Sequence, residues 1–449
     1  MSKKQKSAAA RLRCQTMGLD PDEMLERPGL PKMPRWVAVL KEMKNEKEPE
    51  VGVMPQPEAY QDHTLTVVGN HEDQTIAQMN ECMKVGNVVA GAICADGHLG
   101  YAQPVGGVIG YENQISISGV GFDIACGNMA VKLATTYGEI KHRLPSILGH
   151  ITSAISFGVG RSNSERVDAE LFDNADLWFA SDMNHMRQKA RAQLGTVGSG
   201  NHYVDVFVER PSSLHPEMTM DDCFIWIGVH FGSRGLGHTI ATHYLKAAGG
   251  KDGINVPPAV VDVSTEIGER YLSGMTLAGQ YAYAGREWVV ERVRNIIGGE
   301  VLKTVHNHHN YAWPEIHNGR LLYVVRKGAT PAFPGQEGFV GGSMGDDAVI
   351  IEGVDSQKSR DLLYSTVHGA GRVMGRRAAL KTFTRQQMTD WLAREGVMLA
   401  GADLDESPMA YRRLSEVLAD HDETVKINHV LKPIAVAMAG SDTFDPYKD

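Results

Sequence analysis

Short hydrophobic runs, broken by glycine-rich or polar segments, recur along most of the chain. Runs rich in β-branched and aromatic residues are typical of strands, which we predict at residues 64–69, 87–95, 203–209, 223–229, 320–328, 347–353 and 433–438. Other segments predict helices, at residues 75–84, 182–193, 237–248, 280–296, 371–395 and 409–420. Because strands and helices are mixed without a regular βα alternation, the pattern favours an α+β fold over a doubly wound sheet.

The chain has no internal repeat, and no linker rich in Pro, Gly or Ser divides it. We therefore predict one large mixed domain at residues 61–440. An N-terminal extension and lead-in segment is expected at residues 1–60, and a C-terminal tail at residues 441–449. A chain of 449 residues is long enough to bury a large core in such a domain.

The composition is close to that of ordinary globular proteins, with 42% hydrophobic and 22% charged residues. The formal net charge of -9 excludes a general attraction to nucleic acid, so any polyanion site must be a local cluster of Lys and Arg. The basic N-terminal stretch lacks the apolar region of a signal peptide, and no uncharged apolar run has membrane-spanning length. We therefore expect a cytoplasmic protein without a membrane partner.

The cysteines are odd in number and have no paired spacing: Cys14, Cys82, Cys94, Cys126 and Cys223. This pattern argues against a disulfide framework. A cysteine with a special role is therefore expected to be a thiolate metal ligand or a small buried hydrophobic residue.

Glycines gather in short clusters after the hydrophobic runs, and several clusters also contain His, Cys, Asp or Asn. The histidine-rich segment at residues 305–313, which has no glycine, is a further candidate, and the glycine-containing loops span residues 95–107, 119–128, 195–203, 228–237 and 365–377. The last of them places His368 ahead of two glycines and a group of arginines. Loops at the ends of strands commonly carry binding and catalytic residues, so these six are the candidate functional segments.

Asp123 and Cys126 stand three residues apart in a segment with glycines on both sides. A carboxylate and a thiolate at this spacing can bind one metal, although a surface Asp and a buried free Cys fit the same pattern. His202, His230 and His309 also lie at glycine-rich strand ends, and the five residues form a suitable ligand set. First principles favour zinc for Cys and His, with the carboxylate and further histidines leaving room for a second metal.

The segment HNHHN, residues 306–310, holds three histidines. In an extended strand, His306 and His308 would lie on one face and His309 on the other. Spacing alone does not decide which of them binds a metal.

Two Gly/Ser loops, residues 232–237 and 341–345, can turn backbone N–H groups toward an anion. Basic residues at steps of four and five would form a stripe on a helix: Arg372, Arg376, Arg377, Lys381 and Arg385. Such a stripe is a candidate for contacts with a phosphate backbone, and a solvated helix face is the alternative.

Eight motifs occur in the order found in the RtcB family of RNA-splicing ligases: DGHLG, GVGFDIACG, GSGNHY, GSRGLG, HHNYAW, RKGA, GSMG and HGAGR. The chain resembles this family from about residue 90 to its end, including the segment DESPMAYRRL. The resemblance implies a single large α+β catalytic domain of the RtcB-like type, with glycine-rich metal and nucleotide loops at strand ends.

The family joins an RNA end with a 3′-phosphate or 2′,3′-cyclic phosphate to a 5′-hydroxyl end, through a histidine-GMP intermediate. The resemblance therefore implies a GTP- and Mn²⁺-dependent RNA ligase of RNA repair or tRNA splicing. It implies two Mn²⁺ ions in place of the zinc expected from first principles, and an activating helper protein as a further partner. Two other functions stay open, a metal-dependent RNA-end phosphoesterase and an RNA-end-binding protein without turnover.

Carried over by motif, the resemblance implies that His368 is the nucleophile that takes GMP from GTP. The implied metal ligands are Asp123, Cys126, His202, His230 and His309. The nucleotide is expected against Asn201, His202, Tyr203, Val204, Asp205, His309, Asn310, Gly341, Gly342, Ser343, Met344, His368, Gly369, Ala370 and Gly371. The expected RNA contacts are Arg372, Arg376, Arg377 and Lys381.

Five positions depart from the family's pattern: Asp205, Gly341, Ala348, Gly375 and Ala439. The family usually has a serine at position 348 and, at position 439, a lysine that contacts the nucleotide. The metal and nucleophile positions keep the family's residues. The identity of the nucleotide therefore stays open, whereas phosphoryl-transfer chemistry is expected to be retained.

Overall fold

The computed structural model describes residues 24–27, 30–34, 64–211 and 217–441. The chain forms two compact units, Met1–Asp62 and His63–Asp449. In the first unit the described residues form an antiparallel pair of strands, β1 (Met24–Arg27) and β2 (Leu30–Pro34). The rest of the expected N-terminal extension, and the expected tail beyond residue 441, lie outside the described residues.

The second unit contains a five-stranded sheet in the order β12-β13-β5-β4-β3. Its strands are β3 (Thr64–Val67), β4 (Val88–His98), β5 (Val105–Tyr111), β12 (Asn310–His317) and β13 (Arg320–Lys327). β3 and β4 run parallel, and the other neighbours are antiparallel. The hydrophobic pattern predicted β3, β4 and β13. It missed β5, in which three of the seven residues are glycines, and the edge strand β12, which contains a proline.

A larger, eight-stranded sheet has the order β11-β7-β9-β8-β19-β16-β15, with β18 paired in parallel to β19. Its strands are β7 (Gly127–Thr136), β8 (Tyr203–Glu209), β9 (Phe224–His230), β11 (Val301–His308), β15 (Glu337–Val340), β16 (Ala348–Gly353), β18 (Met398–Ala402) and β19 (Val425–Gly440). Phe339 N on β15 donates to Asn307 Oδ1 on β11, at 3.0 Å, so the two edge strands meet and the sheet nearly closes. The predicted strands in this sheet are confirmed, while β7, β11, β15 and β18 were missed.

Two short strand pairs complete the described strands of the second unit. They are β6 (Gln114–Ser116) with β10 (Val260–Asp262), and β14 (Ala329–Pro331) with β17 (Ser365–Val367). The β14 and β17 pair matters for function because it brings the segment before His368 beside the segment after β13.

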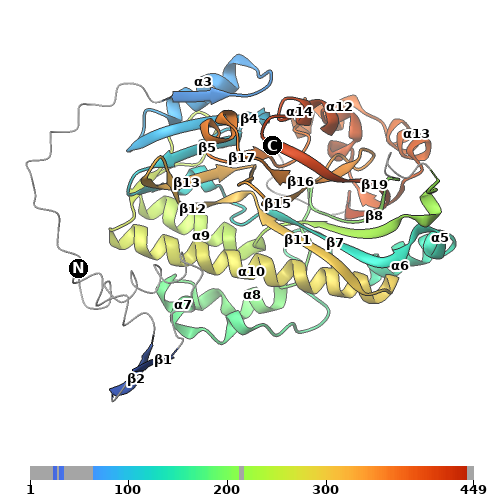
Figure 1. The fold of residues 1–449 in the computed structure, drawn as a ribbon, viewed down its shortest axis with the longest axis horizontal. Coiled ribbons are helices and arrows are strands. Elements are labelled where there is room, and N and C mark those ends of the chain that lie inside the picture. The colour runs from blue at the N-terminus through green and yellow to red at the C-terminus, as the bar shows by residue number, and fades with distance from the viewer. Residues whose placement is uncertain (1–23, 28–29, 35–63, 212–216, 442–449) are drawn as a thin grey trace, which may run out of the picture. The chain divides into compact units, whose positions relative to one another are not determined.

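The helices of the second unit surround these sheets (Figure 1). They are α3 (Asp73–Cys82), α4 (Ile117–Val120), α5 (Tyr137–Ile140), α6 (Leu144–Ala154), α7 (Ala175–Ala180), α8 (Arg187–Gln193), α9 (Arg234–Ala247), α10 (Glu266–Ile297), α11 (Gln357–Asp361), α12 (Arg376–Thr382), α13 (Arg385–Glu395) and α14 (Leu414–Ala419). α10 has 32 residues, packs along α9 and contacts β7 and β9, so the helix expected at residues 280–296 is its C-terminal half. None of the helices in the described residues is both long and apolar enough to cross a membrane.

The helix expected at residues 371–395 is wrong as a single element. Residues 371–375 are not helical, α12 begins at Arg376, and a second helix, α13, begins at Arg385. Thr384 caps α13 by accepting from Gln387 N, and Gln387 returns the bond in a capping box. Because the two helices are separate, the basic residues from Arg372 to Arg385 do not form one helical stripe.

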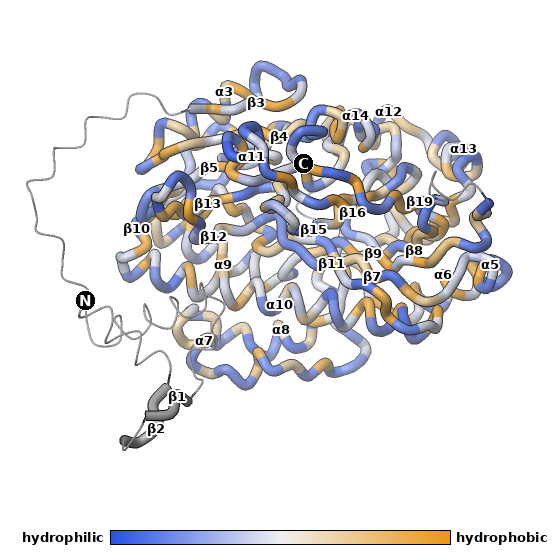
Figure 2. Tube along the Cα trace, viewed as in Figure 1, coloured by the Kyte–Doolittle hydropathy of each residue, from blue (hydrophilic) through white to orange (hydrophobic). Residues whose placement is uncertain are grey.

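Alternation along β8 positions part of the functional site. Val204, Val206 and Val208 pack into a hydrophobic core, whereas Tyr203 and Asp205, on the other face of the strand, line a cleft. Figure 2 shows the hydrophobic residues recurring along β8 and β9 in this way. The prediction that Val204 lies against a nucleotide is therefore not supported for its side chain.

Candidate functional site

One cleft with a volume of about 300 Å³ gathers residues from both large sheets and the loops between them. The sequence-predicted residues that line it are Asp123, Cys126, Asn201, His202, Tyr203, Asp205, His230, His309, Asn310, Gly341, Gly342, Ser343, Met344, His368, Gly369, Ala370, Gly371, Arg372 and Arg376. Val204, Arg377 and Lys381 are not among the lining residues, and the last two are exposed on α12.

Strand register brings the candidate metal ligands together. His230 ends β9, where it is paired with Asn128 on β7 and with Tyr203 on β8. Cys126 immediately precedes β7 and His202 immediately precedes β8, so both lie beside the end of β9. His308, the last residue of β11, is paired with Gly127, which brings the next residue of the chain, His309, to the same edge of the sheet.

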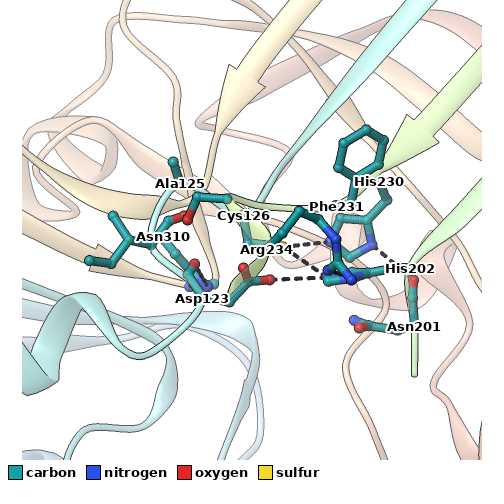
Figure 3. A network of polar contacts seen from close by, with 12 residues as sticks. Asp123, Ala125, Cys126, Asn201, His202, His230, Phe231, Arg234 and Asn310 are labelled. Carbon is teal, nitrogen blue, oxygen red and sulfur yellow. Dashed lines mark hydrogen bonds and ion pairs between the residues drawn. The ribbon is translucent and has the colours of Figure 1, made fainter. Parts of the chain in front are cut away.

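Cys126, His202 and His230 form a cluster in which the three potential ligand atoms all lie within 4.8 Å of one another. Cys126 Sγ is 3.2 Å from His230 Nε2 and 3.6 Å from His202 Nε2. His202 Nε2 is also 3.0 Å from Asp123 Oδ2 (Figure 3). His230 Nδ1 donates to the carbonyl oxygen of Asn201, at 3.0 Å, so His230 Nε2 carries the lone pair that faces the thiol.

His309 lies between this cluster and His368. Its ring centroid is 5.1 Å from that of His230 and 4.9 Å from that of His368. His309 Nδ1 is buried and has no hydrogen-bond partner among the described residues. A buried imidazole nitrogen without a partner is costly, and a bound cation would satisfy it.

The charges of the cluster fit a divalent cation. Burial would raise the pKa of Asp123, but the hydrogen bond and charge of His202 outweigh it and lower the pKa to about 2. Burial, and then the charge of Asp123, raise the pKa of Cys126 well above its usual value. Burial, and then neighbouring charged histidines, hold the pKa values of His230 and His309 well below the usual value. The cluster thus offers one carboxylate, two neutral imidazoles and a thiol that a metal would convert to thiolate.

The three histidines of residues 306–310 face two different sides of the chain, as strand geometry predicted. His306 and His308 face the buried guanidinium of Arg286, with Arg286 Nε 2.8 Å from His306 Nε2 and Arg286 Nη2 3.0 Å from His308 Nδ1. His309 faces the cleft instead. Spacing left the candidate ligand open, and among the three histidines it is His309 that lines the cleft.

Asp96 is a buried partner of His368 that residue-by-residue analysis of the sequence missed. Its carboxylate Oδ2 accepts from His368 Nδ1 at 2.6 Å, from His368 N at 3.0 Å and from Gly369 N at 3.3 Å. Burial would raise the pKa of Asp96, but the charge and hydrogen bonds of His368 outweigh it and lower the pKa. The signal was present, since Asp96 belongs to the motif DGHLG in one of the glycine-rich loops.

The arginines after His368 are held by acidic residues rather than presented on a helix face. Arg376 Nη1 lies 2.9 Å from Asp405 Oδ2 and also bonds to Glu406. Arg372 Nη1 donates to the Tyr411 hydroxyl at 2.8 Å, and Arg372 Nη2 donates to the Asp405 carbonyl. Arg372 and Arg376 therefore help to form the cleft wall, which corrects the prediction of a continuous basic stripe.

Close backbone approach explains two of the glycines. Gly371 has φ of 73°, and a side chain there would collide with the backbone of Asp96. A side chain at Gly341 would collide with the hydroxyl of Tyr203. Both glycines therefore keep the cleft open.

Asp205 lies at the lining of the cleft with a carboxylate oxygen, Oδ1, that has no hydrogen-bond partner among the described residues. Burial raises the pKa of Asp205 well above its usual value. Among the other substituted positions, Gly341 lines the cleft and Gly375 is exposed, whereas Ala348 and Ala439 are buried and do not line the cleft.

The chain is similar to known proteins over most of its length. The model of a family described as "tRNA-splicing ligase RtcB" matches residues 76–183 and 178–439. The "RNA-splicing ligase RtcB" of Escherichia coli K12 is 29% identical over 374 residues, which cover 76% of this chain and 88% of that protein. The "tRNA-splicing ligase RtcB" of Thermococcus kodakarensis is 29% identical, covering 82% and 91%, and the "RNA-splicing ligase RtcB" of Mycobacterium tuberculosis is 30% identical, covering 74% and 92%.

Proposed function

The chain belongs to the RtcB family, and on that premise we propose that it is an RNA ligase. It would join an RNA end with a 3′-phosphate or 2′,3′-cyclic phosphate to a 5′-hydroxyl end. The observation that carries the proposal is the position of His368, whose ring lies 4.9 Å from that of His309 in the cleft that also holds the candidate metal ligands. An imidazole beside loops that suit phosphates favours covalent transfer of a nucleotide.

In the proposed reaction, His368 Nε2 attacks the α-phosphorus of GTP. A P–N bond forms, the P–O bond to pyrophosphate breaks, and GMP stays on the ring. GMP then passes to the 3′-phosphate of one RNA, which regenerates His368 and creates a phosphoanhydride. The 5′-hydroxyl of the other RNA attacks the activated 3′-phosphate, GMP leaves, and a phosphodiester bond remains. A 2′,3′-cyclic phosphate would first be opened by water to the 3′-phosphate.

Asp96 supports His368 as the nucleophile. A carboxylate can only accept, so the contact of 2.6 Å to Nδ1 keeps the proton on that nitrogen and leaves the lone pair on Nε2. When the P–N bond forms, the ring becomes cationic, and the buried carboxylate stabilises this charge. Asp96 therefore orients the ring and favours its guanylylated form.

The nucleotide would occupy the cleft between residues 201–205, 309–310, 341–344 and 368–371. Gly341 and Gly371 let the backbone approach it closely, for the steric reasons given above. Asp205 is a candidate for contact with the nucleotide, since it lines the cleft and its Oδ1 has no hydrogen-bond partner among the described residues. We propose GTP on the family resemblance, and the Asp205, Ala348 and Ala439 substitutions are the reason to test other nucleotides.

Asp123, Cys126, His202, His230 and His309 would hold Mn²⁺, and we propose two ions on the family resemblance. When bound, Mn²⁺ would polarise phosphoryl oxygens and offset charge on the leaving pyrophosphate. The protein's part is to keep Asp123 ionised, to keep His230 and His309 neutral, and to hold the donor atoms of Cys126, His202 and His230 within 4.8 Å of one another.

RNA is proposed to reach the cleft past the residues that follow His368. Arg372 and Arg376 line the cleft but are already paired with acidic or hydroxyl groups. Arg377 and Lys381 are exposed on α12 and are the better candidates for contacts with the phosphate backbone.

A joining assay tests the proposed function. One RNA with a 3′-phosphate and one with a 5′-hydroxyl are incubated with the protein, Mn²⁺ and each of the four nucleoside triphosphates. We expect joining that is lost in His368→Ala and kept in His243→Ala, a matched change of an exposed histidine on α9. Opening of cyclic phosphates without joining would instead favour a phosphoesterase, and RNA binding without any product would favour a binding protein.

A further inference from the structure

Arg286 lies on α10 with its side chain fully buried. Its guanidinium donates to the carbonyl oxygens of Ala125, at 3.1 Å, and Phe231, at 2.6 Å. It also contacts the rings of His306 and His308 at the distances given above. None of these four partners is a carboxylate, and no ion pair between described residues includes Arg286. A buried guanidinium without a carboxylate partner is costly, so it calls for an explanation beyond packing.

Three of the four partners are sequence neighbours of candidate metal ligands, although they come from three separate segments. One segment leads into β7, one follows β9 and one is the end of β11. The neighbouring pairs are Ala125 with Cys126, Phe231 with His230, and His308 with His309. One guanidinium therefore binds a residue next to each of three candidate ligands, through the carbonyl oxygens of Ala125 and Phe231 and through the ring of His308.

The contact with Ala125 falls on a strained piece of backbone. Ala125 has φ of 61°, in the left-handed region that a non-glycine residue disfavours. Its N–H donates to the Asn310 carbonyl at 2.7 Å, and its own carbonyl accepts from Arg286 and lies 3.2 Å from His308 Nδ1. These bonds hold the turn that precedes Cys126, which lines the cleft.

We propose that Arg286 is a positioning residue that sets the geometry of the metal site by fixing the segments of Cys126, His230 and His309. The inference rests on the proposed function, since it takes these three residues as metal ligands. The planar guanidinium has five N–H groups in a rigid fork, so it can reach four acceptors on three separate segments at once. A lysine would keep the charge but could not hold all four acceptors, so charge alone does not preserve the function of Arg286.

Cobalt(II) titration of the full-length protein tests this role without relying on activity. Cobalt bound to a thiolate gives a near-ultraviolet charge-transfer absorption, which reports binding at Cys126, and competition by Mn²⁺ gives the manganese affinity. We expect Arg286→Lys to weaken metal binding about 10- to 100-fold, the usual effect of removing a residue that orients metal ligands, and to change the cobalt spectrum. Wild-type affinity and spectrum in folded Arg286→Lys would overturn the proposal.

Tyr281→Phe is the matched control, because it removes another buried hydrogen bond from α10. The Tyr281 hydroxyl donates to the carbonyl of Ala190 on α8, at 2.8 Å, and α8 carries none of the candidate metal ligands. We expect this variant to bind cobalt as the wild type does. An equal loss of cobalt affinity in both variants would show that α10 acts only through stability, and would also overturn the proposal.

A second variant tests the proposal if Arg286→Lys does not fold. His308→Phe removes one contact of Arg286 while a ring still packs against Tyr311, whose ring centroid is 5.2 Å away. Weaker cobalt binding in this variant supports the proposal, and unchanged binding contradicts it. Absence of the thiolate absorption in the wild type would instead refute the proposed metal site itself, which separates the two failures.

Discussion

Replacing Asp96 by Asn changes the charge beside His368 with little change in volume. In the wild type, one carboxylate oxygen accepts three hydrogen bonds from His368 and Gly369, while the other, Oδ1, has no partner among the described residues. If the amide oxygen faces His368, the NH₂ group takes the position of Oδ1, where the wild-type carboxylate has no hydrogen-bond partner. In the opposite orientation the NH₂ group would face three donors.

The expected loss follows from the strength of these bonds. Hydrogen bonds to a charged acceptor contribute about 1 kcal/mol more than neutral ones, so three weakened bonds amount to about 2 to 4 kcal/mol. If His368 becomes cationic when it accepts GMP, this difference appears in the transition state. The rate of guanylylation should then fall roughly 30- to 1,000-fold.

Single-turnover labelling with GTP radiolabelled at the α-phosphate measures this rate, with Mn²⁺ binding measured in parallel. We expect Asp96→Asn to label slowly and to bind Mn²⁺ as the wild type does, whereas Asp420→Asn, a change of an exposed aspartate, should label normally. Labelling of Asp96→Asn at the wild-type rate would refute the proposed role of Asp96. A proportional loss of Mn²⁺ binding would mean that Asp96 only maintains the fold of the cleft.

Three further changes have distinct expected outcomes. Cys126→Ser should lose most bound Mn²⁺, as measured by metal analysis after dialysis, and a fully metallated Cys126→Ser would contradict the ligand assignment. Gly371→Ala should slow labelling of His368 and lower the melting temperature, because its side chain would collide with the Asp96 backbone; unchanged values would show that the loop adapts freely. Burial would raise the pKa of Glu209, but its bond with His429 and other polar contacts lower it from 4.5 to about 2. The stability that the Glu209 carboxylate adds is therefore present above about pH 4.5 and is lost as the pH falls through 2. Because Glu209 is partly exposed, solvent screens its ion pairs, and in urea unfolding the advantage of the wild type over Glu209→Gln should shrink by about 1 kcal/mol from pH 5 to pH 2. A difference that does not depend on pH would contradict this reading.

The strands that sequence reasoning found are those with dense β-branched and aromatic residues, such as β8 and β9. Those it missed, including β5, β7 and β11, contain glycine, lysine or histidine and exist because neighbouring strands complete their hydrogen bonds. The break between α12 and α13 had a local signal that was overlooked, the capping box from Thr384 to Gln387.

The residues of the candidate site also fall into those that the sequence predicts and those that it does not. The chemical types of the cluster could be predicted because Cys126, His202 and His230 each stand at a glycine-rich strand end. Asp96 could not be singled out by spacing, because its role depends on a contact with His368, 272 residues away in the sequence. Arg286 was equally hidden, since an arginine within a long helix gives no sign of the separate segments it binds.

The most direct test of the account is to locate the nucleotide on the protein. After incubation with Mn²⁺ and GTP, intact mass followed by peptide mapping should find GMP joined to His368, with no adduct in His368→Ala. The same experiment with ATP, CTP and UTP would identify the preferred nucleotide. Absence of an adduct with all four nucleotides, in protein whose metal content has been verified, or an adduct on another residue that persists in His368→Ala, would contradict the account.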